Sequence, residues 1–177
     1  DGIPDLATAN YGFFCYLSLA LHQLYGTRSV LVDLPEMLPL AWTVLSHYNP
    51  GARVVLPHEV DGQLSGPIEA DFVLLTPSQA GLLRDGVADL AINTASFQEM
   101  TYPVIAGYFD LVYRCLREGG LLYCMNEIDC RKVPHAPIEF ERFPWNRRLP
   151  ALIDAEYEYQ RLIQGAPCWH RLQVMAR

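Results

Sequence analysis

The sequence has no long apolar run, no basic block and no leader-like beginning. No apolar stretch reaches the roughly 18 to 20 residues that cross a bilayer, and the chain opens at Asp1 without Met or a basic segment. With a net charge of −7 and no basic cluster beyond a pair such as Arg147-Arg148, a surface that follows nucleic-acid phosphates is not expected. These absences favour a cytoplasmic protein with a small-molecule partner. The start at Asp1 suggests a trimmed chain or one domain of a longer chain.

Cysteine is scarce, with five residues at positions 15, 115, 124, 130 and 168. The number is odd and no C-x-x-C pair occurs, so neither a disulfide framework nor a structural zinc site is expected. Cys15 and Cys115 fall within apolar helical patterns and are predicted to be small core residues.

Several catalytic signatures are also missing. The chain has no G-x-S-x-G elbow, no phosphate-binding P-loop and no H-E-x-x-H zinc motif. No H-x-x-x-H spacing or cluster of Asp, Glu and His indicates a metal, so none is expected. The absence of a G-x-G-x-x-G turn makes a nicotinamide-dependent enzyme the least favoured Rossmann-like alternative.

What the sequence does contain is a regular alternation of apolar runs and amphipathic helices. The runs hardly alternate in polarity, as expected for strands buried on both faces of a parallel sheet. Strands separated by helices of this length predict βαβ crossovers, and hence a single α/β domain over 1–177. The predicted strands are 29–34, 52–57, 71–75, 88–93 and 120–125, and the predicted helices are 12–25, 35–48 and 101–118.

The last third of the chain has a different composition. Residues 126–150 hold four prolines and many charges, and are predicted to form a long loop or lid-like excursion. Residues 151–162 are predicted to form a helix, and residues 169–176 a closing strand.

Ligands of open α/β sheets bind beyond the carboxyl ends of the strands, which directs attention to the residues there. Asp33 ends the run 29–34, where its carboxylate is placed to accept hydrogen bonds from ribose hydroxyls or, alternatively, to begin the following helix. Residues 76–79 (Thr-Pro-Ser-Gln) follow the run 71–75, where they either frame an adenine or form an ordinary turn and N-cap.

Two candidate acid–base groups lie further along. Glu99 belongs to the polar stretch after the run 88–93, but Ser96-x-x-Glu99 also matches a capping box. His135 lies in the excursion. A reaction at a hydroxyl group requires a base to remove its proton, and either side chain would serve.

Three segments resemble the bacterial sugar O-methyltransferases: 30–37 (VLVDLPEM), 89–100 (DLAINTASFQEM) and 119–126 (GGLLYCMN). The similarity covers about residues 5–130. It implies a Rossmann-like class I methyltransferase fold, S-adenosylmethionine (SAM) as cofactor, and a sugar or glycosylated small molecule as the methyl acceptor. The cofactor-binding residues that it implies are Asp5, Ala7, Asn10, Tyr11, Asp33, Leu34, Thr76, Pro77, Gln79, Asn93 and Thr94.

The chain departs from this family in two places. The family's first strand ends in a glycine-rich turn, and the matching stretch 5–12 keeps only Gly12, although Asp5 is still placed to hold the amino group of the cofactor. Family members also carry an N-terminal extension that helps to form the acceptor pocket, so other residues, domains or subunits would complete it here. Both departures keep open the alternative of an inactive pseudo-methyltransferase that serves as a binding domain in a larger assembly.

Overall fold

One eight-stranded sheet runs through the molecule, in the order β3-β4-β2-β1-β5-β6-β10-β9. The computed structural model describes residues 5–10, 15–62, 69–131, 137–159 and 166–176, with 5–10 described by their main chain. Strands β1 to β6 are parallel, and β10 is antiparallel to both its neighbours. The strands are β1 (Asp5–Asn10), β2 (Arg28–Val32), β3 (Val54–Val55), β4 (Phe72–Leu75), β5 (Ala88–Thr94), β6 (Leu116–Glu127), β9 (Ala151–Glu156) and β10 (Cys168–Val174).

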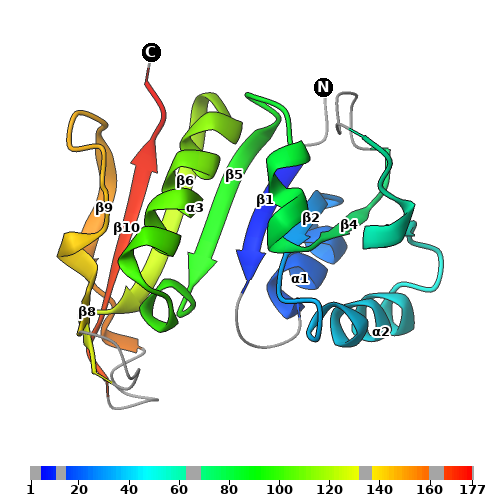
Figure 1. The fold of residues 1–177 in the computed structure, drawn as a ribbon, viewed down its shortest axis with the longest axis horizontal. Coiled ribbons are helices and arrows are strands. Elements are labelled where there is room, and N and C mark those ends of the chain that lie inside the picture. Colours follow the sequence, from blue (N-terminus) through cyan, green and yellow to red (C-terminus); the bar gives the residue numbers. More distant parts are fainter. Residues whose placement is uncertain (1–4, 11–14, 63–68, 132–136, 160–165, 177) are drawn as a thin grey trace.

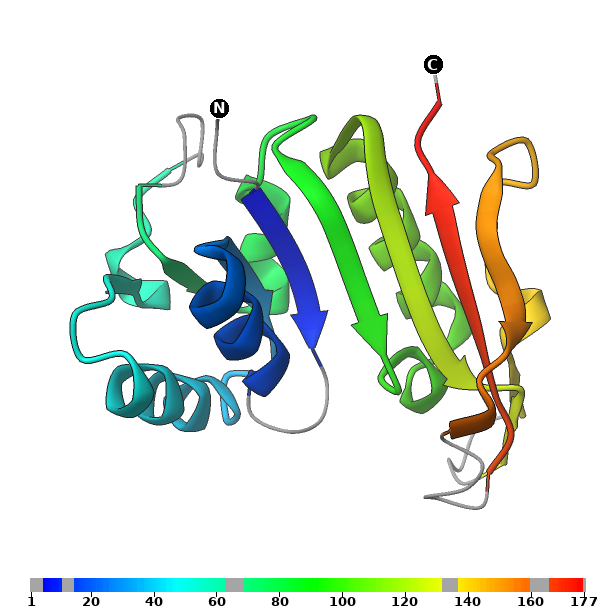
Figure 2. The same cartoon turned by 180° about the vertical axis from the view of Figure 1, so that it is seen from behind.

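Helices lie on both faces of this sheet. Helices α1 (Tyr16–Tyr25) and α2 (Leu38–Tyr48) cover one face, and α3 (Tyr102–Cys115) covers the other (Figures 1 and 2). Because the strand order reverses between β1 and β5, the crevice beyond their carboxyl ends is the topological switch point of the fold. The remaining described elements are short: η1 (Pro57–Glu59), η2 (Pro77–Leu82), η3 (Phe97–Glu99), η4 (Phe140–Arg142) and the hairpin of β7 (Asp129–Cys130) and β8 (Ile138–Glu139).

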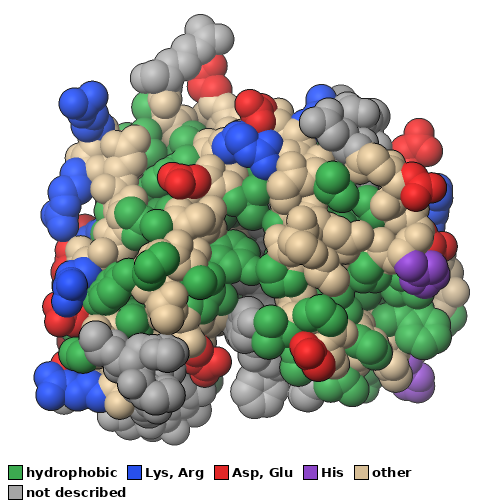
Figure 3. Space-filling view, in the orientation of Figure 1, with side chains coloured by type: hydrophobic (Ala, Val, Ile, Leu, Met, Phe, Trp, Pro, Cys, Tyr) green, Lys and Arg blue, Asp and Glu red, His purple; other side chains and the backbone are tan. Residues whose placement is uncertain are grey.

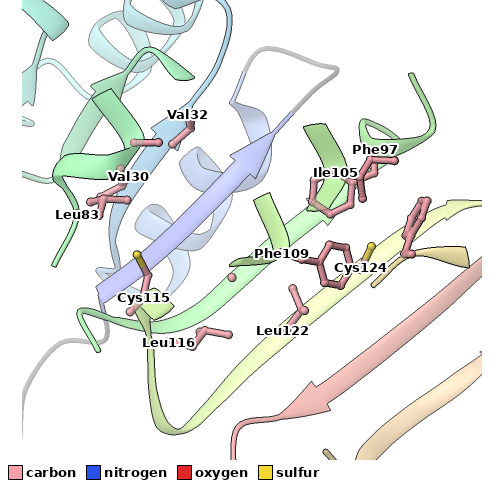
Figure 4. Close-up of a cluster of buried hydrophobic side chains, with 14 of the residues drawn as sticks. Val30, Val32, Leu83, Phe97, Ile105, Phe109, Cys115, Leu116, Leu122 and Cys124 are labelled. Atoms are coloured by element: carbon pink, nitrogen blue, oxygen red, sulfur yellow. The ribbon is translucent and has the colours of Figure 1, made fainter. Parts of the chain in front are cut away.

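Each face of the sheet has its own core. On the α3 side, Phe109 lies over Leu122 and Cys124 of β6 (Figure 4). On the other side, Leu45 of α2 packs against β2 and β4. Strand β2 contributes to both cores, since Val30 faces α3 and Leu31 faces α2. The continuous apolar composition of the central strands follows from this two-sided burial.

The predicted α/β class and mostly parallel sheet are confirmed, with shifted boundaries. Helix α1 begins at Tyr16 because Cys15 has a left-handed backbone, with φ 61°. Helix α2 begins at Leu38, after a turn that contains Pro35. Helix α3 ends at Cys115 rather than before the glycine pair 119–120, and β6 follows it directly.

One expectation for the last third was wrong. Residues 151–156 form the edge strand β9 rather than the start of a helix, because they pair with β10. The described part of the predicted loop or lid over 126–150 contains the end of β6 and the short elements β7, β8 and η4, and it buries Phe140, Phe143 and Trp145 in the core on the α3 side. The closing strand is confirmed as β10.

All five cysteines are free and buried, which confirms the core placement of Cys15 and Cys115. In the part of the chain that the structure describes, no helix is long and apolar enough to cross a membrane. Within the same part, no three His, Cys, Asp or Glu side chains gather closely enough to hold a metal ion.

Candidate functional site

Candidate residues from four neighbouring strands, β4, β2, β1 and β5, lie at the carboxyl ends of those strands. The main-chain N–H of Asp33 donates to the Leu75 carbonyl at 3.1 Å, so the residues after β2 and β4 are side by side. On the other side of the switch point, Asn10 of β1 pairs with Thr94 of β5. The face drawn in Figure 3 is hollowed at its centre, between the half with α3 and the half with β4, and hydrophobic side chains border the hollow.

Asp33 is the half-buried carboxylate at this edge. One of its oxygens accepts the Leu34 N–H at 2.7 Å. Burial raises the pKa of Asp33, and this hydrogen bond offsets only part of the rise. Among the described residues, none forms an ion pair with it. The carboxylate therefore retains lone pairs for a ligand that donates hydrogen bonds.

The field of Asp33 reaches two other groups. The pKa of the Cys15 thiol is raised to about 12, first by burial and then by Asp33. The pKa of the Tyr108 phenol is raised by the same two causes in the same order. Tyr108 comes from α3, so the crevice has walls from both halves of the sheet. Nothing in the sequence indicated that Tyr108 lies near Asp33.

The edge after β4 is built around an N-cap. The Thr76 N–H donates to Gln79 Oε1 at 3.1 Å, and Gln79 Nε2 donates to the Pro57 carbonyl at 2.8 Å. The Gln79 amide therefore performs the turn-and-cap role that was the alternative to reading an adenine. The first two residues of this turn border open space: Thr76 lines a pocket of about 330 Å³ beside Trp42, and Pro77 lines a groove of about 290 Å³ beside Tyr108.

The residues after β5 divide into buried and exposed groups. Asn93 is 2% exposed, and its amide is engaged with Ser96 and Asn126. Thr94 is half-buried at the edge. Glu99 is exposed, and the expected capping box does not form, because Ser96 makes no side-chain cap bond.

The first strand requires a correction. Asp5 and Ala7 were expected in the turn that matches the glycine-rich loop, but they lie within β1. Asp5 opens this strand, five residues or about 17 Å from the carboxyl edge at Asn10, too far to hold a ligand there. Tyr11 and His135 lie outside the described residues, and the exposed Leu34 follows Asp33 at the edge.

Comparisons with known proteins identify the fold. No protein-family model and no curated protein matches the chain. Solved structures do match it, among them the three that follow. One is a methyltransferase of Burkholderia thailandensis that acts on N1 of 1,6-didemethyltoxoflavin and was solved with S-adenosylhomocysteine. It has 11% identity and a TM-score of 0.63, and the match covers 99% of this chain and 72% of the methyltransferase. A SAM-dependent methyltransferase from Aquifex aeolicus has 13% identity and a TM-score of 0.58, covering 98% and 82%.

The third structure is the cyclase SpnF, with 11% identity, a TM-score of 0.67 and coverage of 99% of this chain and 76% of its own. At such identities the likeness establishes the fold, which is that of class I methyltransferases. Because a cyclase shares it, the fold alone does not fix the reaction.

Proposed function

We propose that this chain binds SAM in the crevice at the switch point and takes part in methyl transfer to a small molecule. The observation that carries the proposal is Asp33, a half-buried carboxylate with free acceptor capacity directly after β2. A ribose diol offers two O–H donors, which suit the two oxygens of one ionised carboxylate. The methyltransferase neighbours, one of them solved with S-adenosylhomocysteine, favour this nucleoside over others.

The nucleoside base has two places to go from Asp33. The pocket beside Trp42 and the groove beside Tyr108 both have largely apolar walls, as a flat aromatic base requires. The main chain of Thr76 and Pro77 lies between them. Leu34, exposed next to Asp33, is available to cover the base.

The acceptor we propose is a sugar-type hydroxyl, as the resemblance in the sequence implies. Its proton needs a base, and the two candidates differ in what supports them. Glu99 is exposed at the end of η3, close in sequence to the edge residue Thr94. His135 remains a candidate on sequence grounds alone. Further domains or subunits would complete the acceptor side.

Calorimetric titration with S-adenosylhomocysteine and SAM tests the proposal, with NADH and adenosine as comparison ligands. We expect SAM and S-adenosylhomocysteine to bind and NADH not to bind. Binding of NADH would support a nicotinamide enzyme instead. No binding of either sulfur-containing ligand at 1 mM would refute the proposal.

One observation favours a second candidate, a pseudo-methyltransferase that acts as a binding domain. Of residues 5–12, which match the family's glycine-rich turn by resemblance, only Gly12 is a glycine. Bulky side chains at this turn would oppose close approach of the cofactor to the main chain. This candidate predicts that the unaltered chain does not bind the cofactor and that Tyr11→Gly creates binding.

A further inference from the structure

Side-chain amides buried beside the candidate site hold the turn after β5 in place. Asn93, Gln98 and Asn126 are 2%, 8% and 0% exposed. Asn93 lies near the end of β5, Gln98 lies in η3, and Asn126 lies near the end of β6. Buried amides without partners are costly, so a cluster of this kind has to be satisfied internally.

The contacts of Asn126 join the two strand ends to the turn. Its Nδ2 donates to Asn93 Oδ1 at 2.9 Å, and its Oδ1 accepts the main-chain N–H of Gln98 at 3.1 Å. Gln98 Oε1 then accepts the main-chain N–H of Glu127 at 2.7 Å. Asn93 Nδ2 donates to Ser96 Oγ. The chain from 93 to 98 is thus fixed to β6 at several points.

The turn that is held in this way has an unusual backbone. Ala95 has φ 56°, in the left-handed region that residues with a Cβ avoid. Its N–H donates to the Met125 carbonyl at 2.7 Å. A backbone of this kind persists only when its surroundings over-determine it, and such backbones are concentrated at functional sites.

We propose that Asn126 is a positioning residue for the cofactor site. Fully buried, it touches no ligand itself; it fixes the turn that carries Thr94 and Ala95 at the switch point, acting through Asn93 and Gln98. This inference rests on the proposed function, because it assigns the turn as one wall of the SAM site.

Three substitutions separate positioning from general stability. Asn126→Leu keeps the branched shape of the side chain but removes its hydrogen bonds, so the Gln98 N–H and Asn93 Oδ1 lose a partner. Asn126→Asp keeps an oxygen for the Gln98 N–H, and Asn93 can turn its amide to donate to the new carboxylate. Gln98→Ala breaks the other arm of the cluster, and serves if the leucine variant does not fold.

Gln173→Leu is the matched control. Gln173 is also a buried amide, 3% exposed, with one hydrogen bond to the Asn146 carbonyl and one from the Tyr113 hydroxyl. It pairs with Leu122, four residues or about 13 Å along β6 from Asn126. Loss of the Gln173 hydrogen bonds should lower stability without changing the turn after β5.

Each variant is measured in two ways: its affinity for S-adenosylhomocysteine by calorimetry, and the hydrogen exchange of the amides of 95–98 by NMR. In Asn126→Leu and Gln98→Ala we expect about tenfold weaker binding and faster exchange at the turn. Asn126→Asp should stay within about threefold of the unaltered protein, and Gln173→Leu should bind equally well.

The outcomes distinguish this inference from the proposed function. Faster exchange at the turn with unchanged affinity overturns the positioning role and leaves the proposed function intact. Equal loss of affinity in Gln173→Leu overturns it as well, by showing a general effect of stability. If the unaltered protein does not bind S-adenosylhomocysteine, the proposed function fails and the positioning role with it.

Discussion

Replacing Asp33 with asparagine removes a charge from the edge of the sheet while keeping its shape and one acceptor oxygen. The Leu34 N–H can still donate to that oxygen, so the local main chain should not move. Two ribose hydroxyls that donate to a carboxylate would lose the assistance of its charge. Hydrogen bonds to charged groups contribute about 1.5 to 3 kcal/mol and those to neutral groups about 1. The expected loss is about 1 to 4 kcal/mol, or roughly 5-fold to 1000-fold in affinity for S-adenosylhomocysteine.

The same substitution should raise stability. Burial raises the pKa of Asp33 above its ordinary 3.8, so the folded protein disfavours the charged form relative to the unfolded chain. At neutral pH the charge therefore opposes folding, and Asp33→Asn should increase the melting temperature. The gain should shrink as pH falls through the raised pKa and vanish below 3.8. Ligand affinity of the unaltered protein should fall over the same window, as the carboxylate takes up a proton.

Asp71→Asn is the control for both measurements. Asp71 is also half-buried and accepts a main-chain N–H, that of Arg53 at 2.7 Å, but it lies before β4, at the opposite edge of the sheet. Calorimetry measures the affinity of both variants for S-adenosylhomocysteine, and thermal denaturation measures their melting temperatures. Unchanged affinity in Asp33→Asn, or an equal loss in Asp71→Asn, would refute the assignment of Asp33 to the ribose.

Four further outcomes follow from the packing. Gly120→Ala should lower the free energy of unfolding by more than about 1 kcal/mol, because its Cβ would lie 2.8 Å from the Arg117 carbonyl oxygen. Gly107→Ala should raise it by up to about 1 kcal/mol, because the added Cβ meets open space in α3. Urea denaturation compares the two variants. Phe97→Ala should cost about 3 to 5 kcal/mol in the same assay, as Phe97 is 1% exposed among aromatic rings. Gln79→Ala should cost about 1 to 2 kcal/mol through its lost cap, and a smaller loss would show that the cap is weak. The five buried thiols should resist a thiol reagent at pH 8 until guanidinium unfolds the chain, and rapid labelling would contradict their burial.

The sequence predicted what depends on local pattern. Asp33 stands where an uninterrupted apolar run ends, and the structure places it directly after β2 at the ligand edge. The central strands were recognised for the same reason, since burial on both faces requires continuous apolar residues. Strand β1 was missed because its sequence, Asp-Leu-Ala-Thr-Ala-Asn, has a single large apolar residue. The error placed Asp5 in a turn.

What the sequence did not predict depends on distant partners. The segment 151–156 is rich in helix-forming residues, and only pairing with β10 makes it a strand. The amide roles of Gln79 and Asn93 are decided by Pro57 and Asn126, which lie 22 and 33 residues away along the chain. Cap and ligand contact need the same residue types, so composition could not separate them.

An NMR titration with S-adenosylhomocysteine shows where on the sheet the ligand binds. We expect shifts of the amides at Asp33, Leu34, Thr76, Thr94 and Ala95, the residues at the carboxyl edge of the sheet. We expect no shift at Asp71, at the opposite edge. Shifts confined to other surfaces, or none at 1 mM ligand, would contradict a nucleoside site at the switch point.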